Sequence, residues 1–286
     1  MHIDEKRSAQ TGLDTVQSGN KQWWTAQTMS YDWNEKIGAE KYSAAWFDEI
    51  DRRFIFGARL FGHNTTPFDA VIPFANLAGK RVLEIGCGMG LHTELLVRAG
   101  AQVTTIDISP TSVDVTRRRL ALKGLDAQVI EADAVAAGLP SEAFDFVWSW
   151  GVIHHSSKTG RIVREIDRML KPGGEVRVMV YNLEGMPAYL TIARRYLTGF
   201  WRGRGLDEAL WKDSDGFMAR YYSADMLRDV FSIFFEDVKT HSYGQDADAV
   251  PLPRQLRRPV LRLMSLERQK RLANKRGGLL FVTGRK

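Results

Sequence analysis

Glycines at every second position, directly behind a carboxylate, form the most informative chemical pattern in this 286-residue chain. Gly86, Gly88 and Gly90 follow the apolar run 82–85, in which Glu84 is the only acid. Glycine lets a backbone turn sharply and approach a ligand closely, and the first N–H groups of a following helix point toward that ligand. The pattern therefore predicts a ligand site where a strand passes into a helix.

Two well-known phosphate-binding patterns do not match this turn. A nicotinamide-dinucleotide fingerprint would need a glycine at position 91, where the chain has Leu91. A P-loop is excluded because no Gly-Lys-Ser/Thr triplet follows the turn. The carboxylate of Glu84 just before the turn instead favours a ligand that carries positive charge.

Further acids follow the next two strands. Asp107 lies 21 positions after Gly86, at the end of an apolar run, where a carboxylate in a doubly wound sheet can accept hydrogen bonds from both hydroxyls of a ribose. Asp133 follows the third strand, where a side-chain acceptor can bind the amine of an adenine. Each acid alone could be an ordinary strand-end residue, but their order along one sheet favours a nucleoside site.

The elements that must position these residues alternate between strand and helix. Apolar runs predict the strands, and amphipathic segments between them predict the helices. The predicted strands are 81–85, 102–107, 127–131, 144–150, 174–181, 236–242 and 278–283, and the predicted helices are 91–98, 110–123, 159–170 and 223–231. This order implies an α/β fold with a doubly wound, mostly parallel sheet.

The segments that carry these motifs resemble the class I S-adenosylmethionine-dependent methyltransferases, in particular their type 11 or ubiquinone-biosynthesis-like branch. The matching segments are 82–90, 105–110, 131–134, 144–155 and 170–174. The resemblance implies a Rossmann-like sheet of seven strands with the last strand antiparallel. It also implies an S-adenosyl-L-methionine cofactor and in-line transfer of its methyl group to a small organic or lipid-like acceptor. Two alternatives remain: methylation of a membrane-embedded lipid or isoprenoid at an anionic membrane surface, and a member of the fold that transfers no methyl group.

The same resemblance implies roles for single residues. Glu84 would hold the methionine ammonium, Asp107 the ribose, and Asp133 the adenine amine. The other implied cofactor-binding residues are Gly86, Cys87, Gly88, Gly90, Ile108, Ala134 and Trp150.

Two adjacent histidines follow the fourth strand, where the family places residues between cofactor and acceptor. His154 or His155 would act as a general base if the acceptor must lose a proton. Adjacent side chains point in different directions, so we expect at most one of them to face the acceptor. The alternative is that both are structural. We identify no carboxylate partners that would complete a metal site with this pair, and we expect no metal.

The segments outside this core should recognise the acceptor. Residues 1–20 are polar and small and predict a disordered tail, whereas residues 21–79 are rich in aromatic side chains and predict a helical cap. A helix over 43–60 in this cap either packs on the main domain or closes over the site as a lid. The methyltransferase domain would span 80–286, with insertions at 183–216 and 244–276. The acceptor-binding candidates are Trp24, Tyr31, Trp33, Tyr181, Tyr221 and Tyr222.

The net charge of +6 belongs to the C-terminal end of the chain. Residues 251–286 hold eleven Lys or Arg and one acid, so residues 1–250 carry a net charge of −4, which argues against nucleic acid as a partner. Leucines among arginines over 256–272 predict an amphipathic helix. Through 254–276 it either contacts an anionic membrane or lies solvated beside the last strand. The polar N-terminus resembles no secretory signal, so we expect a cytoplasmic protein, with peripheral membrane contact as the alternative.

Overall fold

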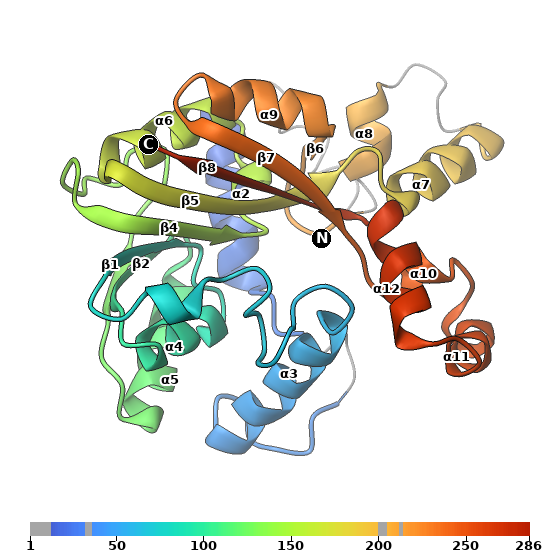
Figure 1. Ribbon diagram of the computed structural model, residues 1–286, viewed down its shortest axis with the longest axis horizontal. Coiled ribbons are helices and arrows are strands. Elements are labelled where there is room, and N and C mark those ends of the chain that lie inside the picture. Colours follow the sequence, from blue (N-terminus) through green and yellow to red (C-terminus); the bar gives the residue numbers. More distant parts are fainter. Residues whose placement is uncertain (1–12, 32–35, 200–204, 212–213) are drawn as a thin grey trace.

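One twisted sheet organises the chain, with its main strands in the order β3-β2-β1-β4-β5-β8-β7 (Figure 1). The computed structural model describes residues 13–31, 36–199, 205–211 and 214–286. The strands are β1 (Arg81–Ile85), β2 (Gln102–Asp107), β3 (Gln128–Glu131), β4 (Phe144–Trp150), β5 (Leu170–Asn182), β7 (Glu236–Tyr243) and β8 (Leu279–Arg285). Strands β1 to β5 pair in parallel, and β8 runs antiparallel to both β5 and β7. The predicted seven-stranded sheet is confirmed, and a short additional strand, β6 (Tyr221–Tyr222), pairs with β5.

Helices cover both faces of this sheet. They are α4 (Leu91–Arg98), α5 (Pro110–Lys123), α6 (Thr159–Met169) and α9 (Ala224–Ser232). Successive side chains of a strand point to opposite faces, so in β1 Leu83 joins one apolar cluster with α6 and α9, and Val82 joins a second cluster with α4. The end of β1, which the glycine turn follows, is thereby held by packing on both faces of the sheet.

An aromatic helix, α3 (Ala44–Gly57), packs beside the N-terminal half of the sheet. Ser43 caps it by accepting a hydrogen bond from the backbone N–H of Trp46, and Trp46, Phe47, Ile50 and Phe54 are buried. The helix predicted over 43–60 is confirmed, with its C-terminal end three residues earlier.

The prediction of disorder over residues 1–20 is wrong for residues 13–20. These residues form the first turns of α2 (Leu13–Ala26), whose Val16 and Asn20 are buried. Asn20 Nδ2 donates a hydrogen bond to the carbonyl of His155, more than a hundred positions away in the chain. The segment is ordered by contacts with residues that are distant in the sequence. Its polar composition does not indicate these contacts. Residues 1–12 lie outside the described part of the chain.

The two insertions are helical. The first holds α7 (Met186–Leu197) and α8 (Leu206–Trp211), and the second holds α10 (Asp246–Ala249), α11 (Arg254–Arg262) and α12 (Leu266–Lys275). The single amphipathic helix predicted over 256–272 is wrong, because Ser265 begins a new helix by accepting a hydrogen bond from the N–H of Arg268. In Figure 1 α7 and the helices α10 to α12 lie on the same side of the molecule, beyond one end of the sheet.

Candidate functional site

A cavity of about 720 Å³ opens at the carboxyl ends of β1, β2 and β4. This volume is in the range of small-molecule sites, and the carboxyl edge is where parallel sheets bind ligands. The core contributes the glycine turn and the acids after β2 and β3, whereas α2 and α3 contribute the cover. The sequence-predicted residues on its wall are Trp24, Tyr31, Gly86, Cys87, Gly88, Asp107, Ile108, Asp133, Ala134, Trp150, His155 and Tyr181.

The glycine turn has the geometry that only glycine adopts without strain. Gly86 has a φ of +88°, and a Cβ added there would lie 2.2 Å from the Val152 side chain. Gly88 has a φ of +52°, and a Cβ there would meet no atom within 4 Å, so the backbone faces open space. Gly90 is the N-cap residue of α4 and has a φ of +78°, and a Cβ added there would lie 3.1 Å from the side chains of Arg119 and Thr116.

Asp107 is held in a fixed orientation by backbone donors. The N–H of Ser109 donates to Oδ1 at 2.9 Å, and the N–H of Gly88 donates to Oδ2 at 3.1 Å. Burial raises the pKa of Asp107, and these two backbone hydrogen bonds oppose the rise. Cys87 packs beside it, and burial raises the pKa of the Cys87 thiol well above its usual range, which keeps it protonated.

Helix α2 lies over the acid that follows β3. The Gln17 amide donates to both carboxylate oxygens of Asp133, at 3.0 and 2.9 Å, and Lys21 forms an exposed ion pair with Glu131 at 2.6 Å. Asp133 also accepts a hydrogen bond from the N–H of Val135 at 2.9 Å. The N-terminal helix therefore closes the side of the cavity that the sequence assigns to the adenine.

Glu84 is buried behind the turn and is not among the described residues that line the cavity. Thr93, in α4, donates a hydrogen bond to its carboxylate. Direct contact between Glu84 and an ammonium group thus stays a prediction. In the structure, the Glu84 carboxylate links β1 to α4 through its hydrogen bond with Thr93. Burial raises the pKa of Glu84 to about 7, and the Thr93 hydrogen bond opposes the rise.

This raised pKa predicts a pH-dependent stability. The usual pKa of a glutamate is 4.5, so between pH 4.5 and about 7 the folded state holds a proton that the unfolded state has lost. The free energy of unfolding should therefore fall, as the pH rises through this window, by about 3 kcal/mol relative to Glu84→Gln, which cannot titrate. Urea unfolding of both proteins at several pH values measures this difference. A difference that does not vary with pH would contradict the assignment.

The two histidines lie in a short 3₁₀ turn, Ile153–His155, and have different surroundings. His155 lies on the cavity wall and its Nδ1 is 2.7 Å from the carbonyl of Met218. His154 is fully buried, and neither of its ring nitrogens has a hydrogen-bond partner among the described residues. Burial holds the pKa of His154 well below its usual range, so this ring stays neutral. No group of three potential metal ligands occurs in the described part of the chain.

Aromatic side chains form another part of the cavity wall. The Tyr31 ring stacks on Phe54 with 4.0 Å between centroids, and Trp150 meets Phe54 edge-on at 5.4 Å. Tyr181 completes this wall. Burial raises the pKa values of Tyr31 and Tyr181, and the nearby Asp215 carboxylate raises both further, so both phenols remain protonated donors.

The remaining acceptor candidates lie elsewhere. Tyr222 is only 8% exposed and belongs to the main apolar cluster, and Tyr221 contacts Tyr181 with 5.4 Å between centroids. Neither tyrosine is among the described residues of the cavity wall. Trp33 lies outside the described residues.

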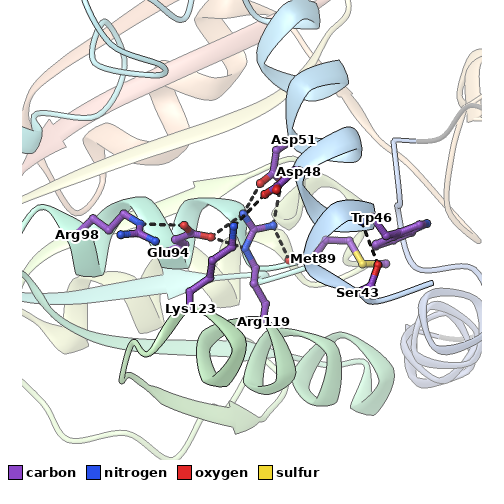
Figure 2. A network of polar contacts seen from close by, with 9 residues as sticks. All are labelled: Ser43, Trp46, Asp48, Asp51, Met89, Glu94, Arg98, Arg119 and Lys123. Carbon is purple, nitrogen blue, oxygen red and sulfur yellow. Dashed lines mark hydrogen bonds and ion pairs between the residues drawn. The ribbon is translucent and has the colours of Figure 1, made fainter. Parts of the chain in front are cut away.

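A buried arginine fixes α3 as a wall of the cavity (Figure 2). Arg119, in α5, is fully buried and pairs with Asp51 of α3 and, at 2.8 Å, with Glu94 of α4. Its guanidinium also donates to the carbonyl of Met89, in the glycine turn, at 3.3 Å. Because Asp51 itself lines the cavity, one side chain connects the turn, the sheet helices and the aromatic cover.

Several wall residues escaped the sequence analysis. Among them are Gln17, Asn20, Phe54, Asp215 and Gln245. Gln17 and Asn20 fall in a segment of polar composition, and Asp215 and Gln245 fall at insertion ends that match no core pattern. Only the aromatic density around Phe54 was a usable signal.

The chain is similar to known methyltransferases in sequence and in fold. The family model described as a methyltransferase domain matches residues 83–178. A ubiquinone biosynthesis O-methyltransferase of Stutzerimonas stutzeri (strain A1501) is 40% identical over 109 residues, which are 37% of this chain and 47% of that protein. The chain thus spans about half the length of the first curated relatives it matches.

Two solved structures show the same fold at low sequence identity. Phosphoethanolamine N-methyltransferase 2 of Haemonchus contortus, in complex with S-adenosyl-L-methionine, is 19% identical with a TM-score of 0.54, over 87% of this chain and 60% of that chain. The [4+2]-cyclase SpnF is 20% identical with a TM-score of 0.52, over 88% of this chain and 84% of that chain.

Proposed function

We propose that this chain is an S-adenosylmethionine-dependent methyltransferase that transfers a methyl group to a small organic or lipid-like acceptor, because residues 83–178 match the methyltransferase-domain family. One observation carries the proposal. The glycine turn, Asp107 and Asp133 line the same cavity as the aromatic side chains of Tyr31, Phe54 and Trp150. A polar nucleoside and an apolar acceptor could therefore bind in it together.

The residues on the polar side fit an S-adenosyl nucleoside. Two backbone donors hold the Asp107 carboxylate, and each of its oxygens can accept a second hydrogen bond from a ribose hydroxyl. Asp133 lines the same cavity and is the proposed acceptor for the adenine amine, and the open space beside the backbone of Gly88 leaves room for the methionine part. When bound, S-adenosylmethionine supplies a methyl group already activated on a sulfonium.

Little covalent chemistry is then required of the protein. The chain must align the acceptor with the activated methyl group and exclude water while the positive charge is neutralised. Helix α2 and the stacked rings of Tyr31 and Phe54 would serve this purpose, because they line the cavity from outside the sheet, where Phe54 also meets Trp150 at the end of β4.

Binding and product analysis test the proposal. We expect isothermal titration to show one equivalent of S-adenosylmethionine or S-adenosylhomocysteine bound per chain. Incubation with panels of hydroxylated aromatic and lipid-like compounds should then yield a product heavier by one methyl group, as measured by mass spectrometry. Absence of cofactor binding would overturn the proposal. A mass change other than one methyl group would instead favour the alternative reaction on this fold.

We propose His155, and not His154, as the general base for an acceptor that must lose a proton. A carbonyl only accepts, so His155 Nδ1–H donates to Met218 and the lone pair of the neutral ring lies on Nε2. His155→Gln should lower kcat by about a hundredfold, the lower range for general base catalysis, and leave the Kd for S-adenosylhomocysteine within about threefold. His241→Gln, an exposed histidine on β7, is the matched control. An unchanged kcat would remove His155 from this role.

A further inference from the structure

A cationic arm projects beside the cavity end of the molecule. We define this basic arm as residues 251–276, which contain α11 and α12 and hold nine Lys or Arg against one acid, Glu267. In Figure 1 both helices lie beyond the sheet, away from its core. Most of these cations are exposed, among them Arg258, Arg262 and Arg271. The arm thus concentrates positive charge on a chain whose remainder is mildly acidic.

An apolar row runs along α11 on the outside of this arm. Leu256, Val260 and Leu263 are 60%, 38% and 90% exposed, and spacings of four and three residues place them on one helix face. On another face of α11, Leu261 is buried in a cluster with Leu60, Ala249, Val250 and Ala273. This cluster packs the arm against the body of the protein. The row of Leu256, Val260 and Leu263 lies on a different face of the helix and therefore points outward.

A second exposed row lies on α7, in the other insertion. Tyr189, Leu190, Tyr196 and Leu197 are 48%, 50%, 74% and 83% exposed and recur at the spacing of one helix face. Helix α10, which leads into the basic arm, contacts α7, so the two insertions are neighbours. Tyrosine is typical of the boundary between lipid and water, where its ring is buried and its hydroxyl hydrated.

We propose that the basic arm and α7 dock peripherally on an anionic lipid bilayer. Apolar rows on cationic helices match a surface that offers both hydrocarbon and negative charge. A second copy of this chain is a poorer occupant, because it would bring two cationic arms together. No helix in the described residues is both long and apolar enough to cross a bilayer, so the contact is peripheral.

Docking in this way would place the cavity close to the lipid. Gln245 lies on the cavity wall and is also the N-cap residue of α10, six residues before the arm begins. A bound bilayer would therefore lie near the part of the cavity wall that Gln245 forms. The docking itself does not depend on the proposed reaction, and it is measured without cofactor or acceptor.

Vesicle sedimentation of the full chain tests the proposal. We expect binding to vesicles of phosphatidylcholine mixed with phosphatidylglycerol, weak binding to phosphatidylcholine alone, and weaker binding at higher salt, because salt screens the charges. The double variants Leu256→Ser/Leu263→Ser and Tyr196→Ser/Leu197→Ser should each lower the partition coefficient about tenfold. Arg258→Gln/Arg262→Gln should lower it to a similar degree at low salt.

Matched controls separate docking from folding. Ile233→Ser changes an apolar side chain that is 72% exposed at the end of α9, and Arg118→Gln changes an exposed arginine of α5; both should bind vesicles like the wild type. Urea unfolding of every variant shows whether it remains folded. Equal binding to neutral vesicles, or no loss in either apolar double variant, would overturn the proposal. So would loss of a dimer, seen by sedimentation velocity without lipid, in place of loss of vesicle binding.

Discussion

Replacing Asp107 with asparagine is expected to weaken the binding of S-adenosylhomocysteine by about a hundredfold, because hydrogen bonds to a charged group contribute about 1.5–3 kcal/mol. The variant keeps the size of the side chain and removes its charge. It also places an amide N–H₂ where two backbone N–H groups, of Gly88 and Ser109, now donate to the carboxylate. One of these donors would lose its acceptor, and the turn that presents Gly88 to the cavity would loosen.

Isothermal titration measures this loss, with Asp114→Asn as the matched control. The Asp114 side chain is 77% exposed on α5, so this variant should bind the ligand like the wild type. Urea unfolding of Asp107→Asn shows whether the effect is local to the site. A Kd within about threefold of the wild type, in a folded variant, would exclude Asp107 from the ribose contact.

The Arg119→Met variant should lower the free energy of unfolding by about 3–5 kcal/mol, the cost of removing one partner from a buried ion pair. The side chains of Asp51 and Glu94 are only 15% and 9% exposed, and both would lose their counter-ion. Burial already raises the pKa of Asp51, and Arg119 opposes this rise, so the unpaired carboxyl would take up a proton more readily. The polar contacts by which Arg119 joins Asp51 of α3 to the Met89 carbonyl of the glycine turn would be lost together.

Urea unfolding measures the effect, with Arg118→Met as the control, because Arg118 is the exposed neighbour on the same helix. Arg119→Lys provides a milder test, since a lysine keeps the charge but cannot bridge both acids with a planar fork. We expect its free energy of unfolding to lie between those of the wild type and Arg119→Met. Equal stabilities of Arg119→Met and Arg118→Met would show that the network does not hold the cover in place.

Features with a local cause were predictable from the sequence. Strands β1, β2 and β4 begin and end where the apolar runs predict, and Gly86 and Gly88 have the positive φ that their turn requires. Asp107 and Asp133 could be placed on one edge of the sheet because parallel strands expose their carboxyl ends together. In each case the signal lies within a few residues of the feature.

Features that depend on distant residues were not predictable in this way. Helix α2 is polar and forms against β3 and the histidine turn, through contacts such as Gln17 with Asp133 that span more than a hundred positions. The same holds for the adjacent residues His154 and His155: both are buried, but of the two only His155 is among the described residues of the cavity wall. Periodicity cannot separate these outcomes, because the packing of other segments decides them.

The sequence by itself thus determined the sheet, the glycine turn and the acids at the strand ends. These features depend on backbone geometry and apolar periodicity, which are properties of residues close together in the chain. Only the tertiary structure decided which side chains from outside the sheet line the same cavity. Tyr31 and Phe54 from the cap, Asp215 and Gln245 from the insertions, and Gln17 from α2 converge on one cavity. The buried pairing of Arg119 with Asp51 holds part of that cover in place, and it joins residues 68 positions apart. Contacts over such separations leave no periodic trace in the chain.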